Sequence, residues 1–430
     1  MKKSANLLLV LAILFFYSAF FIRTPFESFL FKLRFLFEII LSFSAIYFLF
    51  YKEKNCKNRL LVFFAVLMFL PAFYSAWRAN SFFGQPLLFG LLVERRWMTI
   101  GFSFLLYFLL VKKTLDFQTV EKAFIIMAFL SLFLFMSVYI SAELFPDLTI
   151  LFKNAVKYTR FKGLRVKLNY YFLVFGAIYF FVRFILKKTK KDFIVFMVFL
   201  AVLVLFFKGR IVFILLLLTV YIFLFVYERR KAVPKAIGLF FVLLVFFGFV
   251  FLIDSNFAKE VVSPYKAVVE TVQGKSTRDF SIVSRKQEAN KIISFLMKNP
   301  QCYFLGAGRL SKQWKDGYKR IFGRLFPLDV GVLGVVFVYG LLGLIVVFVI
   351  PLFIVAMVIL KIKDFEEKDV FLLSLKYLLV FVLLQSLFSS KMVFYPYTFA
   401  LPLFVILAYF RVRGVSVEDI EKSLRFRSKA

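Results

Sequence analysis

The chain has 430 residues, of which 62% are hydrophobic, and it carries 57 Lys and Arg against 24 Asp and Glu. Soluble proteins are about 45–50% apolar, so this composition excludes an ordinary soluble fold and indicates an all-α polytopic membrane protein. The chain has no histidine and only two cysteines, which argues against a zinc or iron–sulfur site. We therefore expect no metal and no cofactor, and any chemistry must use carboxylates, Arg, Lys, Tyr or Ser.

Repeated apolar runs of about 17–25 residues are each long enough to cross a hydrocarbon core of about 30 Å. The first run follows Lys2 and Lys3 and lacks a small-residue cleavage site, so we expect it to be a retained span rather than a signal peptide. We predict about twelve transmembrane helices, over residues 5–22, 34–51, 60–77, 97–111, 120–142, 168–186, 193–207, 211–227, 236–253, 330–360, 370–388 and 395–412.

The charges of the short loops predict the orientation. The two termini and every second loop hold about 27 Lys and Arg, and the short loops of the other set hold about 15. Positive charge in short loops marks the cytoplasmic side, so both termini should be cytoplasmic. The chain then divides into four parts: helices 1–9 in residues 1–253, an extracytoplasmic loop region in 254–329, helices 10–12 in 330–412, and a cytoplasmic tail in 413–430.

Three outer segments are strongly basic. The stretch 255–328 carries fourteen Lys and Arg against five Asp and Glu, and the loop 143–167 includes Arg160 and Arg165 among its cations. The turn Lys208-Gly209-Arg210 lies between apolar helices, where a charge is costly and usually faces a cavity or a partner. These segments predict a pocket for pyrophosphate or an anionic headgroup, for which Arg gives bidentate contacts.

An amphipathic helix is predicted within the long outer loop, ending at Asn299-Pro300. Ser284 and Gln287 have capping-box spacing, and an apolar stripe follows the helical period. This helix should lie on the membrane surface or over the mouth of the bundle, with Arg285 in its first turn. Its apolar stripe consists of Ala289, Ile292, Ile293 and Leu296.

Two further features flank the last group of spans. Gly306-Ala307-Gly308 lacks the rest of a nucleotide-binding fingerprint and predicts a turn that brings Arg309 and Lys312 back toward the bundle. Asp329 begins the apolar run 330–360, where we expect it to be an N-cap and also functional. Small residues at Gly340 and Gly343 should let another helix or a lipid chain approach closely.

These features resemble the O-antigen ligases and O-antigen polymerases. In that family the large periplasmic loop is followed by a His, a small polar residue, nine further residues and Gly-x-x-Gly. This chain has the same spacing from Asp329 and Val330 to Gly340 and Gly343, with Asp329 in the position of the His. Further similarity covers residues 160–345 and consists of Phe161–Arg165 with Asn169, Lys208–Arg210, Arg285, Asn299-Pro300 and Leu305–Gly308. The missing histidine favours a polymerase over a ligase.

The resemblance implies a metal-independent glycosyltransferase of cell-envelope polysaccharide or lipopolysaccharide synthesis in the bacterial inner membrane. It would move a glycan from undecaprenyl pyrophosphate to a glycan or lipid acceptor on the periplasmic side, among membrane lipids and without nucleic acid. Asp329 would orient or deprotonate the acceptor hydroxyl, and Arg210 and Arg285 would stabilise the leaving pyrophosphate. The residues assigned to substrate binding are Arg165, Arg160, Lys208, Arg309, Gly340 and Gly343.

A flippase or transporter of lipid-linked oligosaccharides is the main alternative. It predicts internal repeats and ionisable residues within the spans; no clear repeat is found, and Lys376 is the main charged candidate. A peptidoglycan-type glycosyltransferase of the shape, elongation and division family would also use an outer-loop Asp, but has about ten spans. A membrane scaffold would leave the outer arginines unexplained.

Overall fold

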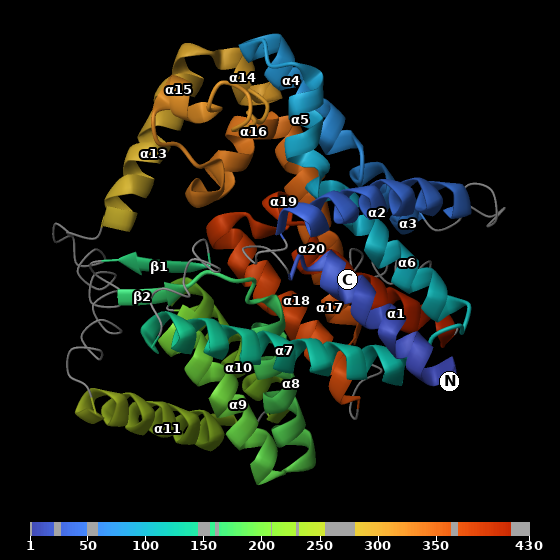
Figure 1. Ribbon diagram of the computed structural model, residues 1–430, viewed down its shortest axis with the longest axis vertical. Coiled ribbons are helices and arrows are strands. Elements are labelled where there is room, and N and C mark those ends of the chain that lie inside the picture. Colours follow the sequence, from blue (N-terminus) through green and yellow to red (C-terminus); the bar gives the residue numbers. More distant parts are fainter. Residues whose placement is uncertain are drawn as a thin grey trace, which may run out of the picture.

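The computed structural model describes residues 2–20, 27–49, 59–144, 155–159, 163–207, 209–228, 232–253, 280–362 and 369–413. Most of these residues are helical, and the one exception among regular elements is a short β-hairpin (Figure 1). The prediction of an all-α protein is thus confirmed for the bulk of the described chain.

The first half of the described chain contains α1 (Lys2–Tyr17), α2 (Glu27–Tyr47), α3 (Arg59–Leu67), α4 (Leu70–Phe83), α5 (Leu87–Glu94), the 3₁₀ helix η2 (Arg95–Thr99), α6 (Ile100–Val111), α7 (Phe117–Leu144), β1 (Val156–Thr159), β2 (Gly163–Val166), α8 (Tyr171–Lys187), α9 (Lys190–Val202) and the π-helical turn η4 (Leu203–Phe207). The second half contains α10 (Arg210–Glu228), α11 (Ala232–Ile253), α13 (Phe280–Lys298), α14 (Pro300–Leu305), α15 (Tyr318–Phe322), the 3₁₀ helix η6 (Pro327–Val330), α16 (Val332–Leu344), the π-helical turn η7 (Ile345–Val349), α17 (Ile350–Lys361), α18 (Val370–Ser389), α19 (Lys391–Phe394) and α20 (Tyr397–Val412).

Within the described residues, each of the twelve predicted spans overlaps at least one helix. By length and composition, five described stretches could cross a membrane: Arg59–Phe83, Phe117–Leu144, Ile211–Glu228, Val332–Lys361 and Val370–Ser389. Large apolar side chains lie on the outside of several helices; Phe133 is 71% exposed and Val245 is 67% exposed. Surfaces of this kind are unfavourable in water and suit contact with lipid chains.

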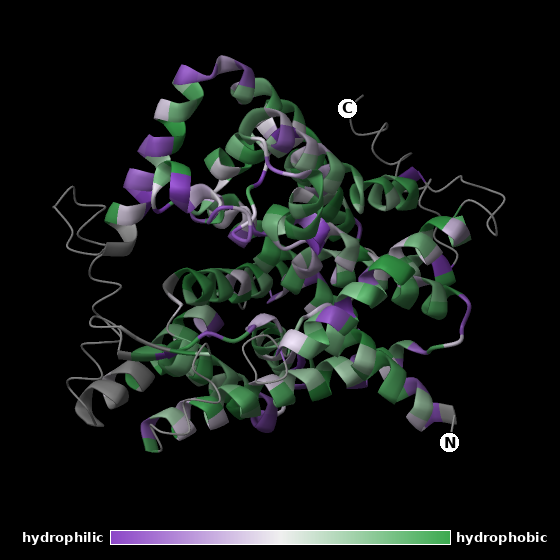
Figure 2. Ribbon diagram, turned by 45° about the horizontal axis from the view of Figure 1, so that its top comes forward, coloured by the Kyte–Doolittle hydropathy of each residue, from purple (hydrophilic) through white to green (hydrophobic). Residues whose placement is uncertain are grey.

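The long helices are mostly hydrophobic, whereas hydrophilic residues gather at one end of the molecule. In Figure 2 the long helices are green over most of their length, and purple bands gather on α13 and the segment after it. The hairpin of β1 and β2 lies within the predicted outer loop 143–167 and pairs Lys157 with Arg165 in antiparallel register. Figure 1 shows this hairpin and α13 on the same side of the molecule, with the N-terminus on the opposite side.

The predicted helix in the outer loop is confirmed, but its capping box is wrong. The helix α13 begins at Phe280, so Ser284 lies inside it, and the Ser284 hydroxyl donates to Glu288 Oε1 at 3.1 Å. Ile292 and Leu296 are buried as the stripe predicts, whereas Ile293 is 41% exposed. The buried face is therefore narrower than the predicted one and includes the polar pair of Ser284 and Glu288.

The long apolar run 330–360 does not form one regular helix. Gly340 interrupts α16 with φ +72°, a backbone conformation that glycine adopts without steric cost. The prediction that Asp329 caps this helix is wrong, because Asp329 lies in η6 and Gly331 occupies the N-cap position, without a side-chain cap.

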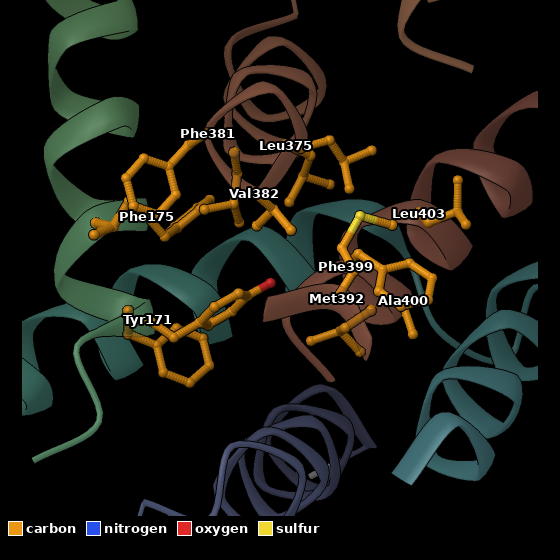
Figure 3. Packing of buried hydrophobic residues seen from close by; sticks show 14 of the residues in the cluster. Tyr171, Phe175, Leu375, Phe381, Val382, Met392, Phe399, Ala400 and Leu403 are labelled. Carbon is orange, nitrogen blue, oxygen red and sulfur yellow. The ribbon is translucent and has the colours of Figure 1, made fainter. Parts of the chain in front are cut away.

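A packed aromatic and aliphatic core holds the C-terminal helices in place. Figure 3 shows Phe175 of α8 close to Phe381 of α18, and Met392 of α19 beside Phe399 of α20. All four side chains are buried. Because Met392 is fixed in this core, the backbone of the neighbouring residue Lys391 is fixed as well.

Candidate functional site

The helical hairpin of α4 and α5 carries a buried glutamate. The helices approach closely because Gly90 lies against Ala76; a Cβ at Gly90 would lie 2.6 Å from Ala76 Cα. This packing brings Ser75 to Glu94, the last residue of α5, and the Ser75 hydroxyl donates to Glu94 Oε1 at 3.2 Å. Glu94 is 1% exposed, and a carboxylate buried to this degree requires a charged partner.

The turn Gly306-Ala307-Gly308 is inserted between α4 and α16. A Cβ at Gly308 would lie 2.2 Å from Ala79 N, and a Cβ at Gly306 would lie 2.4 Å from Val338 O. Both glycines have positive φ, and the Gly308 N–H donates to Val338 O at 3.0 Å. Only glycine fits either position, and the turn directs the following residue toward the bundle.

That residue, Arg309, is the partner of Glu94. Its Nη1 lies 3.5 Å from Glu94 Oε2, its N–H donates to Ser75 Oγ at 3.0 Å, and its carbonyl accepts from Gln85 Nε2 at 3.1 Å. Burial lowers the pKa of Arg309, but Glu94 together with the neighbouring tyrosines Tyr339, Tyr318 and Tyr395 outweighs burial and raises that pKa, so the guanidinium stays charged. The predicted return of Arg309 to the bundle is confirmed, whereas Lys312 is exposed.

Arg96 connects η2 to the segment before α20. Its Nη1 donates to Phe394 O at 3.2 Å, and its Cζ lies 4.9 Å from the centroid of the Tyr395 ring. Arg309 approaches the same segment from the other side, with its Cζ 5.2 Å from the centroid of the Phe394 ring. Burial, followed by the charge of Arg309, lowers the pKa of Arg96.

Lys391 adds a third cation. It follows Ser390, which has φ +47°, and its Nζ lies 4.5 Å from the centroid of the Tyr395 ring and 5.6 Å from that of Tyr170. The Tyr170 hydroxyl accepts from Gln385 Nε2 at 2.8 Å. The hydrogen bond between Gln385 and Tyr170 thus fixes the position of the Tyr170 ring beside the Lys391 ammonium.

We call Glu94, Arg96, Arg309, Lys391 and Tyr395 the Tyr395 cluster. Of the carboxylates in the part of the chain that the structure describes, Glu94 is the one that forms an ion pair within the cluster, and its partner is Arg309. Arg96, Arg309, Lys391 and Tyr395 are each partly accessible. The cluster therefore concentrates positive charge at a place that an anion can reach.

A second buried ion pair lies next to the cluster. Arg34 Nε lies 2.8 Å from Glu38 Oε1, one turn apart on α2, and both side chains are buried. Arg95 stacks on Phe31, with its Cζ 4.0 Å from the ring centroid, and interacts electrostatically with Glu38. This pair and Arg95 add another net positive charge to the cluster's surroundings.

The structure brings Arg165 beside the predicted basic turn. Arg165 Cζ lies 5.2 Å from the centroid of the Phe207 ring, which in turn lies 4.5 Å from that of Tyr170. Through these two rings Arg165 is connected to the surroundings of Lys391. Arg210 begins α10, and its side chain lies outside the described residues, as do Arg160 and Lys208.

Arg285 and Asp329 lie on two elements that pack together. Glu288 of α13 accepts from the Phe326 N–H, just before η6, at 3.2 Å. Both Arg285 and Asp329 are exposed, unlike the half-buried Tyr395 cluster. A Cβ at Gly331 would lie 3.2 Å from the carbonyl oxygen of Phe388, so Asp329 lies near the end of α18, shortly before Lys391.

The two glycines of the predicted motif differ in their neighbours. A Cβ at Gly340 would lie 2.1 Å from Phe304 O and 2.5 Å from Gly306 N, so the end of helix α14 approaches closely here, as predicted. A Cβ at Gly343 would lie 2.4 Å from Cβ of Tyr339 on the same helix. Gly340 therefore joins the outer loop to the broken helix.

Sequence reasoning missed Glu94, Arg96, Lys391 and Tyr395. A signal for three of them was available, because Glu94 and Arg96 lie in one short charged segment between apolar spans and Lys391 lies in another, as Arg210 does. A charge at such a position is costly, whatever its sign. Nothing in the local sequence marks Tyr395.

No family model matches the chain, and no curated protein matches it significantly. No group of three or more His, Cys, Asp or Glu side chains that could hold a metal ion is found in the described ranges.

Proposed function

We propose that this protein is a glycosyltransferase that moves a glycan from undecaprenyl pyrophosphate to an acceptor sugar hydroxyl on the outer face of a bacterial inner membrane, acting as a polymerase rather than a ligase. The proposal includes about twelve spans with both termini in the cytoplasm. It combines the order of motifs along the sequence with the electrostatics of the Tyr395 cluster.

One observation carries the proposal: three half-buried cations with one contacting carboxylate lie among apolar helices. Excess positive charge in such surroundings is unfavourable unless an anion compensates it. A diphosphate linked to a polyprenyl chain matches both features, because its head is anionic and its tail is apolar. Arginine suits the head because its guanidinium forms bidentate contacts with phosphate oxygens.

The origin of the cluster residues is consistent with an outer site. Arg96, Arg309 and Lys391 come from three segments that the charge rule assigns to the extracytoplasmic side, and Arg165 comes from a fourth. In this proposal the three cations bind the diphosphate and stabilise its negative charge as it leaves. Arg165, together with Arg160, Lys208 and Arg210 of the same outer surface, supports the head group.

Asp329 and Arg285 would act on the acceptor side. Both are exposed and lie on packed elements, so an acceptor sugar approaching from outside can meet them first. Asp329 would accept a hydrogen bond from the acceptor hydroxyl and orient it, and Arg285 would hold an anionic part of either substrate.

The direct test is a reaction in proteoliposomes. The full chain would be incubated with undecaprenyl-pyrophosphate-linked repeat units, and the products separated by size. A ladder of products supports a polymerase, and one transfer onto a different lipid acceptor indicates a ligase. Absence of any product, with movement of the labelled lipid between leaflets, would contradict the proposal.

A lipid-linked oligosaccharide flippase is the second candidate. The Arg34–Glu38 pair favours it, because both residues are buried inside one apolar helix, where transporters place ionisable groups. The same proteoliposomes distinguish the two functions, since a flippase changes the leaflet of the lipid and leaves the glycan length unchanged.

A further inference from the structure

We propose that Tyr395 accepts the proton of the acceptor hydroxyl during glycosyl transfer. This inference rests on the proposed function and assigns a second role within the same site. It concerns a residue that neither the motif pattern nor the basic loops indicate.

The position of the Tyr395 ring is well defined. The Tyr395 N–H donates to Lys391 O at 2.8 Å and closes the short helix α19. The flanking residue Phe394 is 1% exposed, and the Tyr395 ring meets Tyr397 edge to face at 5.8 Å between centroids. Tyr395 is nevertheless only partly buried, and the proposal requires a substrate to reach its hydroxyl.

Charged groups from three elements face this phenol. Arg96 approaches from η2, Lys391 from α19 and Arg309 from the turn after α14, and Tyr397 of α20 is the neutral neighbour. Burial would raise the pKa of Tyr395, but the three cations outweigh burial and lower it. The phenolate is therefore more accessible here than for a free tyrosine, which suits a general base.

Other candidate bases of the described site are less suited to this step. Glu94 is 1% exposed and is engaged by both Ser75 and Arg309, so it cannot reach an acceptor. Asp329 is exposed and lies in η6, where it can orient a hydroxyl at the surface. The chain contains no histidine, and Tyr395 combines contact with the cation cluster and access from outside.

The Tyr395 phenolate takes the proton of the acceptor hydroxyl and becomes a neutral phenol. The acceptor oxygen forms a bond to the anomeric carbon, while the bond from that carbon to the phosphate oxygen breaks with its electron pair. The products are the new glycoside and undecaprenyl pyrophosphate, whose added negative charge lies against Arg96, Arg309 and Lys391.

The test compares Tyr395→Phe with Tyr303→Phe in the full chain. Tyr303 is 46% exposed on α14 and lies outside the cluster, so it serves as the matched control. Removing a general base typically lowers the rate about 100- to 10,000-fold. We expect Tyr395→Phe to lower kcat by at least about 100-fold with little change in KM for the donor, and Tyr303→Phe to be unaffected.

A pH profile distinguishes a catalytic role of Tyr395 from a purely structural one. Activity should rise with pH as Tyr395 loses its proton, and difluorotyrosine at position 395, a more acidic phenol, should move this rise to lower pH. A Tyr395→Phe variant with normal kcat and an unchanged profile would overturn the inference. Absence of any product from the native chain would overturn the proposed function instead, and an absorbance titration of the phenol would then still report whether the phenolate forms.

Discussion

Arg309 Nη1 lies 3.5 Å from Glu94 Oε2, and this contact joins two segments that are 215 residues apart in the sequence. It ties the turn after α14 to the α4–α5 hairpin. The same turn is bonded to the broken helix α16, so the cation of Arg309 lies at a fixed place beside Tyr395.

Replacing Glu94 by Gln should destabilise the protein, because it leaves the half-buried guanidinium of Arg309 without a counter-charge. Loss of one partner of a buried pair costs about 3–5 kcal/mol. Thermal unfolding in detergent should show a lower Tm, and adding Arg309→Met should restore part of the stability but not the activity. Equal Tm values for Glu94→Gln and the native chain would contradict this account.

Gly340→Ala should be destabilising, because φ +72° is unfavourable for alanine and the added Cβ would meet Phe304 O. The strain of one such residue is about 1–3 kcal/mol. Gly238→Ala on α11 is the control, since nothing lies within 4 Å of its Cβ and its φ is not positive; it should be neutral or slightly stabilising. Similar losses of stability in both variants would argue against the role given to Gly340.

Asp329→Asn should abolish or strongly reduce polymer synthesis while leaving the Tm unchanged, because the side chain is exposed and acts on the acceptor. Complementation of a deletion strain, read as the length distribution of the polysaccharide, measures the effect. Full-length polymer from Asp329→Asn would remove Asp329 from the site.

Lys391→Met should raise KM for the lipid-linked donor and weaken inhibition by inorganic pyrophosphate, because one of three cations of the cluster is lost. A charge-assisted contact of this kind is worth about 1.5–3 kcal/mol, which corresponds to roughly a 10- to 150-fold change in affinity. Lys312→Met, an exposed lysine outside the cluster, is the control. Identical inhibition constants for the two variants would contradict diphosphate binding by the cluster.

Labelling of introduced cysteines tests the orientation. With Cys56 and Cys302 replaced by Ser, a membrane-impermeant maleimide should label Lys315→Cys in intact spheroplasts and label Lys187→Cys only after permeabilisation. Both lysines are exposed, so access depends on the side of the membrane. The reverse pattern would invert the proposed topology.

The apolar runs predicted most of the long helices. Where the structure describes them, these runs are largely helical, and the amphipathic helix α13 ends at Lys298, next to the predicted stop at Asn299-Pro300. These features depend on local composition and periodicity, which a single sequence contains. The predicted caps are wrong: Ser284 and Asp329 have residue types suited to caps, but α13 begins at Phe280 and Gly331 occupies the N-cap position of α16.

Which charged residues contact one another depends on the tertiary structure. Arg96 and Phe394 are 298 residues apart, and Glu94 and Arg309 are 215 apart, so no spacing in the sequence relates them. Their contacts depend on close packing at Gly90, Gly306, Gly308 and Gly340, where backbones approach within distances that any larger residue would prevent. Hydropathy predicts that a segment is buried, but the partner of a buried charge depends on the arrangement of all the helices around it.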